Sequence, residues 1–167
     1  MMTSKLKFQV VPLAEVAKDD VAVIRPEGPV VLIVDDEQVI ADTLSIILTR
    51  NGFSTVTAYN GESALMLAKE VRPSLLISDV VMPRMSGVEL AIAVVEMIPE
   101  CKVLLFSGQA ATVDLLHQAR EAGHDFTTLA KPVHPTDMLR RVKSYFQEDQ
   151  SSSLSRASSS ESAYSVQ

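Results

Sequence analysis

Acidic residues stand side by side in the stretch VVLIVDDEQVI, residues 30–40, directly after a run of five apolar residues. Like charges at the end of a buried strand repel one another, so this arrangement indicates that a positive charge is bound there. A further carboxylate, Asp79, ends the segment LLISD, residues 75–79. Carboxylate oxygens are the ligands that Mg²⁺ or Mn²⁺ prefers in proteins. Asp35, Asp36 and Asp79 are therefore candidate metal ligands, provided that the fold brings them together.

Short apolar segments from residue 30 onward predict such a fold. Five of them, rich in Val, Leu and Ile, alternate with longer segments of helical period, which is typical of parallel strands joined by crossover helices. The pattern predicts the α/β class, with a five-stranded parallel sheet in a doubly wound (βα)5, flavodoxin-like arrangement. The expected strands are 30–35, 53–58, 75–79, 102–107 and 126–130.

The carboxyl ends of the expected strands carry the polar residues that could do chemistry. Asp35 and Asp36 end the first strand and Asp79 ends the third, while Ser107 and Lys131 end the fourth and fifth. Each residue alone has an ordinary explanation as a helix cap, a turn residue or a surface charge. In a parallel sheet, however, ligands bind where the strand ends meet, so the whole set predicts one shared site.

The segments between the strands carry helix boundaries. The first helix is expected to stop at Asn51-Gly52, the second to open after Asn60, and the third to run from about residue 87 to residue 97. The fifth helix is expected to begin at Pro135. The fourth helix is expected to carry the apolar residues Val113, Leu116 and Ala119 and to end at Gly123.

The two ends of the chain differ from the middle. Residues 29–147 form the expected folded domain, and residues 1–28, interrupted by prolines, form an N-terminal extension that we expect to be partly flexible. Residues 151–167 hold nine Ser in seventeen positions, too little apolar surface to offset the entropy of ordering. We therefore expect a disordered Ser-rich tail over 148–167.

Composition restricts the function classes. The 167-residue chain has a formal net charge of −6 and no Lys/Arg-rich run, so we expect no direct nucleic-acid partner. No segment approaches the roughly 20 apolar residues of a membrane span, so we expect no membrane insertion. The N-terminus lacks the apolar core of a signal peptide and Cys101 is the single cysteine, which together indicate a cytoplasmic protein.

Four motifs, LIVDDE, ISDVVMPRMSG, LLFSGQA and LAKPV, resemble in order and spacing the receiver domain of two-component response regulators. The resemblance implies that Asp79 is the phosphorylated aspartate. It also implies that Asp36 binds Mg²⁺ directly, that Asp35 binds it mostly through water, and that the backbone carbonyl of Val81 completes the protein's ligands. Mn²⁺ suits the same oxygen ligands.

Two further roles follow from the same resemblance. Ser107 corresponds to the hydroxyl that bonds the phosphoryl group, and Lys131 to the cation that steadies it. In this family the bond between the Lys and the following proline is commonly cis, so we expect a cis Lys131–Pro132 bond. One position departs from the family, because Thr128 stands where an aromatic residue usually turns inward on activation. We therefore expect coupling to run through the fourth helix and its preceding loop rather than through Phe126.

The resemblance implies a phosphorylation-dependent signalling switch of a two-component system or phosphorelay. A histidine kinase or a histidine phosphotransfer protein would supply the phosphoryl group, and output would be contact with a downstream protein target that the sequence does not identify. We therefore expect a phosphoprotein, namely a response regulator of the single-domain type. We expect it to assist its own phosphorylation and dephosphorylation and not to act as a metabolic enzyme.

Three alternatives remain at this point. The chain could be a receiver-like adaptor that is never phosphorylated, although its complete set of site residues argues against this. A haloacid-dehalogenase-like phosphatase would need Asp-x-Asp on the first strand, where this chain has adjacent acids. A flavodoxin-like binding module would need a phosphate-binding loop after that strand, where the acids would repel the flavin phosphate.

Overall fold

Five parallel strands form one sheet in the order β2-β1-β3-β4-β5, in a computed structural model that describes residues 28–108 and 111–160. The strands are β1 Val30–Val34, β2 Ser54–Ala58, β3 Leu75–Asp79, β4 Lys102–Ser107 and β5 Thr127–Ala130. The helices are α1 Gln38–Arg50, α2 Gly61–Val71, α3 Gly87–Met97, α4 Ala111–Glu121 and α5 Pro135–Ser160. Strands and helices alternate along the chain, which confirms the predicted doubly wound, flavodoxin-like arrangement.

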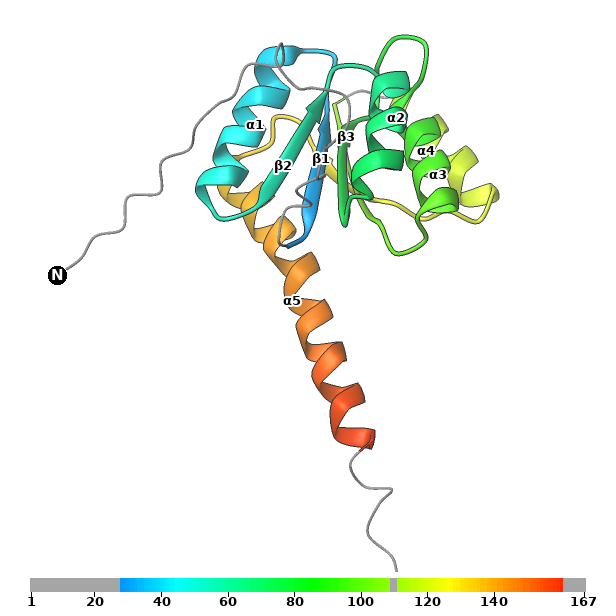
Figure 1. Ribbon diagram of the computed structural model, residues 1–167. Coiled ribbons are helices and arrows are strands. Elements are labelled where there is room, and N and C mark those ends of the chain that lie inside the picture. The colour runs from blue at the N-terminus through cyan, green and yellow to red at the C-terminus, as the bar shows by residue number, and fades with distance from the viewer. Residues whose placement is uncertain (1–27, 109–110, 161–167) are drawn as a thin grey trace, which may run out of the picture.

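Helices cover both faces of the sheet (Figure 1). Alternate strand residues point to opposite faces, so Leu32 and Leu76 belong to the cluster under α2, α3 and α4, whereas Val31 and Ile77 belong to the cluster under α1 and α5. All five residues of β1 are buried. The near-continuous apolar strands of the sequence are thus explained by a sheet buried on both sides.

Helix boundaries mostly follow the expected capping residues. Asn60 caps α2 by accepting a hydrogen bond from the Ser63 backbone N–H at 2.8 Å, and Asn51 is the C-cap of α1. Ser86 caps α3 in a capping box with Glu89. This last cap fixes the point at which the loop after β3 turns into the helix.

The buried face of α4 begins one residue before the first apolar residue expected on this helix. Val113 is 66% exposed, whereas Ala119 is buried and Leu116 is partly buried. The buried face also includes Thr112 and the partly buried Leu115, so its positions are spaced by three, four and seven residues from Thr112. The polar Thr at the first of these positions hid the start of the buried face in the sequence.

The C-terminal helix also differs from the prediction. A disordered tail was expected from residue 148, but α5 continues to Ser160 and projects away from the sheet (Figure 1). Extending a helix that has already formed costs less than nucleating one, and residues 148–160 contain no Gly or Pro to stop it. Residues 1–27 and 161–167, which were assigned to the extension and to the end of the tail, lie outside the described residues.

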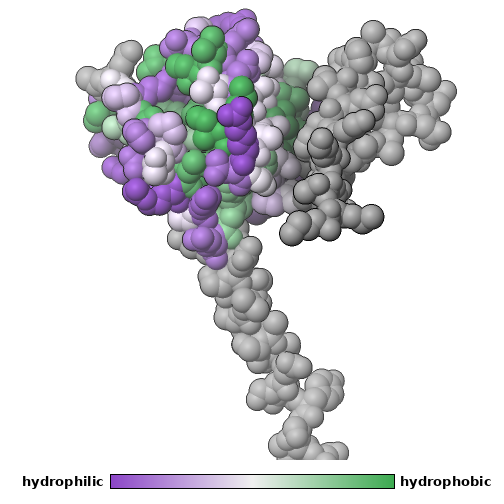
Figure 2. Space-filling view, turned by 90° about the vertical axis from the view of Figure 1, so that its left-hand side faces the viewer, coloured by the Kyte–Doolittle hydropathy of each residue, from purple (hydrophilic) through white to green (hydrophobic). Residues whose placement is uncertain are grey.

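The side of the molecule that carries α1 shows small hydrophobic patches between hydrophilic residues (Figure 2). Val39 and Ile46 of α1 are 79% and 52% exposed. Isolated exposed apolar residues of this kind are common on folded domains. Among the described helices, none has the length and apolar character needed to cross a membrane.

Candidate functional site

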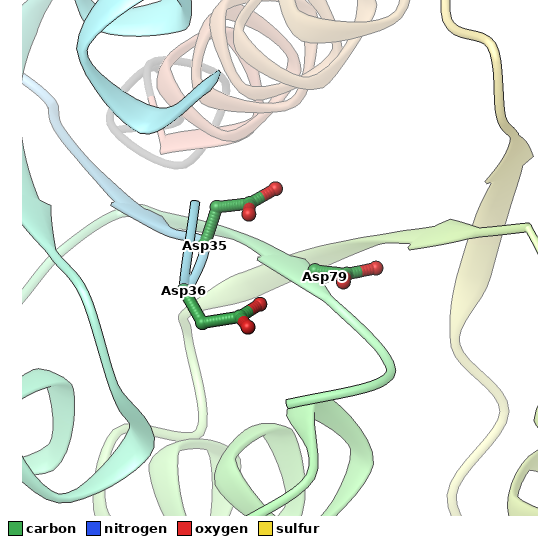
Figure 3. Close-up of side chains that lie close together, drawn as sticks. All are labelled: Asp35, Asp36 and Asp79. Atoms are coloured by element: carbon green, nitrogen blue, oxygen red, sulfur yellow. The ribbon is translucent and has the colours of Figure 1, made fainter. Parts of the chain in front are cut away.

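Three carboxylates meet at the carboxyl ends of neighbouring strands. Asp35 and Asp36 follow β1, Asp79 is the last residue of β3, and these two strands pair with Val34 opposite Ser78. One ligand atom from each carboxylate lies within 4.8 Å of the others. Figure 3 shows the three side chains extending to the same side of the strand ends. The fold thus brings the three candidate metal ligands together, and their hard oxygen atoms suit a divalent cation.

Asp35 is the most enclosed of the three, with only 1% of the residue exposed. Its Oδ1 accepts a hydrogen bond from the Glu37 backbone N–H at 2.9 Å, and its Oδ2 lies 3.5 Å from Lys131 Nζ. Burial raises the pKa of the Asp35 carboxyl, and the Glu37 N–H and the Lys131 charge oppose that rise. Asp36 is exposed. Its carboxylate is therefore more accessible to a hydrated cation than that of Asp35.

Lys131 provides the positive charge of the site. Its Nζ lies 3.1 Å from Asp79 Oδ1 as well as 3.5 Å from Asp35 Oδ2. Burial alone would lower the pKa of the Lys131 ammonium, but the hydrogen bond to Asp79 and the charges of both carboxylates raise it overall. The ammonium is consequently held in its charged form between two of the acids.

The end of β5 fixes the direction of Lys131. The Lys131 backbone N–H donates a hydrogen bond to the Ser107 carbonyl at 2.7 Å, and the Lys131–Pro132 peptide bond is cis, as predicted. Gly108 lies so close that a Cβ there would stand 3.3 Å from Lys131 Cβ. Ser107, half-buried at the end of β4, lies at the same edge of the sheet as Lys131. The structure therefore places all five predicted strand-end residues at one edge.

The loop between β3 and α3, residues 80–86, closes one side of the site. The Val80 N–H donates to the Phe106 carbonyl at 3.0 Å, and the Gly87 N–H donates to the Val80 carbonyl at 2.9 Å. Val81, the predicted carbonyl ligand, lies in this loop and is 40% exposed. A Cβ at Gly87 would stand 1.9 Å from the Asp79 carbonyl oxygen. Only glycine fits at this position, whereas the sequence predicted only that the third helix begins near this residue.

Comparison with known proteins agrees with this geometry. Residues 31–143 match the family described as "Response regulator receiver domain". The chain belongs to this family.

Curated relatives of the receiver are longer proteins. The chain is 33% identical over 113 residues to the "Probable transcriptional regulatory protein TcrX" of Mycobacterium tuberculosis, covering 68% of this chain and 47% of that protein. It is 28% identical over 113 residues to the "DNA-binding response regulator MtrA" of Mycobacterium leprae, covering 68% of this chain and 49% of that protein. The chain thus spans about half the length of the curated relatives it matches.

Solved receiver structures share the fold. The chemotaxis protein CheY4 of Vibrio cholerae is 29% identical with a TM-score of 0.62, covering 70% of this chain and 98% of that chain. A structure described as FixJ-N is 29% identical with a TM-score of 0.61, covering 71% of this chain and 94% of that chain. The family match favours the receiver interpretation over the phosphatase and the flavin-binding module.

Proposed function

We propose that this receiver is a phosphorylation-dependent switch of a two-component system or phosphorelay, and that Asp79 accepts the phosphoryl group. The observation that supports this proposal is the position of the Asp79 carboxylate, which lies 3.1 Å from the Lys131 ammonium and inside the three-acid cluster. A carboxylate that is only partly buried, beside a cation and two further acids, has access both to a donor and to a metal ion.

The reaction is phosphoryl transfer from a phosphohistidine of a histidine kinase or a histidine phosphotransfer protein. An Asp79 carboxylate oxygen attacks phosphorus, an O–P bond forms, and the P–N bond to the donor imidazole breaks and leaves its electron pair on the imidazole nitrogen. Lys131 would bind the incoming phosphoryl oxygens and neutralise their charge, because its Nζ already contacts the Asp79 carboxylate. The residues supply mainly positioning and charge, which is the role of a signalling domain rather than a metabolic enzyme.

The acid cluster fits Mg²⁺, with Mn²⁺ as a chemically similar alternative. We assign direct coordination to the exposed Asp36, to Asp79 and to the Val81 backbone carbonyl, and coordination through water to Asp35, whose two oxygens already face Glu37 N–H and Lys131. When bound, the metal ion would neutralise negative charge on the transferring phosphoryl group.

The switching step uses Ser107. Its position at the end of β4, at the same edge as Asp79 and Lys131, suits a hydroxyl that bonds a phosphoryl oxygen on Asp79. Such a bond would draw the end of β4 toward the site and bias the position of α4. Thr128, the departure from the family, is exposed, while Phe126 packs against the cluster under α4. These positions support coupling through α4.

The downstream partner is proposed to be a protein. Names of curated relatives describe DNA-binding regulators, but this chain spans about half of their length, and its formal net charge of −6, without a Lys/Arg-rich run, supports a protein partner over nucleic acid. The competing proposal, an adaptor that is never phosphorylated, keeps the same fold and differs only in whether Asp79 reacts.

Intact-mass measurement tests the proposal directly. The full chain is incubated with a small acyl phosphate and Mg²⁺, and the wild-type protein is expected to gain one phosphoryl group that Asp79→Asn does not gain. Glu96→Gln, which removes an exposed acid on α3, is the matched control and should gain the group like the wild type. An unmodified wild-type protein would favour the adaptor, and equal modification of the Asp79→Asn variant would refute the choice of residue.

A further inference from the structure

The first residue of α2 makes an unusually close approach to the β3–α3 loop. A Cβ built on Gly61 would lie 2.7 Å from Met85 Cβ and 2.8 Å from both Met85 Cγ and Sδ. Real Cβ atoms essentially never approach a neighbour within 3.0 Å. Because the nearest atom is Met85 Cβ, which is fixed to the backbone, rotating the Met85 side chain cannot make room for a side chain at position 61.

The helix side of this contact is held firmly. Gly61 is buried, and Asn60 before it caps α2 by accepting from the Ser63 N–H. Ala64 and Ala68, on the same helix, are fully buried in the cluster under α2 and α3. Small alanines let α2 lie close to the sheet, so this helix cannot retreat without opening the core. An atom added at position 61 would therefore displace the loop rather than the helix.

The loop side is anchored at its ends by backbone hydrogen bonds and in its middle by apolar packing. Backbone hydrogen bonds fix Val80 to β4 and Gly87 to Val80, and the capping box at Ser86 fixes the start of α3. Between these points Arg84 has a φ of +67°, in the left-handed region that a side chain disfavours. Its ion pair with Glu62, at 3.4 Å, joins two solvent-exposed side chains and contributes little to stability. Met82, 8% exposed, is buried in the core cluster, and the Met85 N–H donates to the Pro83 carbonyl at 2.8 Å. Met85 packing therefore supports the middle of the loop together with these two contacts.

We propose that Gly61 and Met85 form a positioning contact that sets the place of the β3–α3 loop and, with it, the Val81 backbone carbonyl beside the acid cluster. This inference rests on the proposed function, since it assigns a role to residues that support a metal ligand. Neither residue touches the reacting atoms. Their effect is indirect, because Mg²⁺ requires near-ideal octahedral geometry and tolerates a displaced ligand poorly.

Isothermal titration with Mg²⁺ tests the contact in the full chain. Gly61→Ala is expected to weaken Mg²⁺ binding about tenfold, the lower end of what losing outer support of a metal site costs. Helix propensity alone predicts that Gly61→Ala stabilises the protein, because Ala is the better helix former. At saturating Mg²⁺ the Gly61→Ala variant should again accept phosphate on Asp79 near the wild-type rate, which loss of folded protein would not allow.

A double-mutant cycle separates the contact from general damage to the loop. Met85→Gly removes the side chain that faces position 61. Gly61→Ala should therefore weaken Mg²⁺ binding in the protein that keeps Met85, and should change the affinity little in the Met85→Gly protein. Met85→Ala alone, which removes Cγ and Sδ from the contact, should also weaken binding, and it tests the contact if Gly61→Ala fails to fold. An equal loss in both backgrounds, or unchanged affinity in Gly61→Ala and Met85→Ala, would overturn the inference.

The failure of the inference is distinguishable from that of the proposed function. A wild-type protein that binds Mg²⁺ and accepts phosphate, together with a Gly61→Ala variant of unchanged affinity, removes only the positioning role. A wild-type protein that does neither removes the proposed function and the positioning role together. Amide chemical shifts of residues 81–86 in the metal-free Gly61→Ala variant provide a second measurement, and these residues should show displaced resonances if the loop moves.

Discussion

Replacing one acid of the cluster should make the metal-free receiver more stable. Asp35, Asp36 and Asp79 offer oxygens no further than 4.8 Å from one another, and Lys131 contacts only Asp35 and Asp79 among them. The negative charge of Asp36 is therefore the least neutralised of the three. Asp36→Asn removes its charge while keeping the shape of the side chain, so its effect on the free energy of unfolding reports the repulsion.

The expected size follows from the distances. At 4.8 Å two unit charges repel by about 0.9 kcal/mol in water and by about 3.5 kcal/mol at an effective dielectric constant near 20. Asp36 is exposed, so the lower value applies, and two neighbouring acids give about 2 kcal/mol. Lost attraction to Lys131 and to the N-terminus of α1 removes roughly half of this gain. We expect Asp36→Asn to raise the unfolding free energy by about 1 kcal/mol.

Urea unfolding at low ionic strength, with and without Mg²⁺, is the assay. Low salt is needed because screening weakens exposed charge pairs. In chelator the Asp36→Asn variant should be more stable than the wild type, whereas Mg²⁺ at 100 times its dissociation constant should stabilise the wild type by about 2.7 kcal/mol and the variant far less. Glu96→Gln makes the same change in net charge away from the site and should change stability by less than about 0.5 kcal/mol. A less stable Asp36→Asn variant in chelator would refute the electrostatic reasoning.

Three other changes test separate parts of the molecule. Gly87→Ala should lower the unfolding free energy by about 3 kcal/mol in urea, because the new Cβ would stand 1.9 Å from the Asp79 carbonyl oxygen; a loss below 1 kcal/mol would contradict this. Thr112→Val should raise it by about 1 kcal/mol, since the buried Thr112 hydroxyl has no hydrogen-bond partner among the described residues, and an unchanged midpoint would count against this account. Ser107→Ala should blunt the phosphorylation-dependent change in hydrogen exchange over residues 111–125 while Asp79 still accepts phosphate, whereas Phe126→Leu should leave it largely intact; the reverse result would make Phe126 the switch.

The sheet and the positions of the candidate site residues could be predicted from sequence because each strand by itself shows the pattern that identifies it. Each strand is an apolar run that ends in a polar residue, and parallel strands place all such ends at one edge. The edge of the sheet therefore holds the expected residues, with contacts among Asp35, Asp36, Asp79 and Lys131 and with Ser107 at the end of the neighbouring strand. Only the first buried position of α4 was missed, because Thr112 looks solvent-facing in sequence yet is buried, and among the described residues its hydroxyl has no hydrogen-bond partner.

The two glycines that border the site show what sequence patterns omit. Gly61 opens a helix and Gly87 follows a cap, and either position has ordinary local explanations in which a small residue is merely tolerated. Their φ angles are not left-handed, so the backbone conformation at these positions does not require glycine. The requirement comes from Met85 and from the Asp79 carbonyl, which reach these positions only after the sheet has formed. Helix propensity would favour alanine at both positions. If alanine stabilised the helix but disturbed the site, the reason for glycine at these positions would be close packing around the loop and not local helix preference.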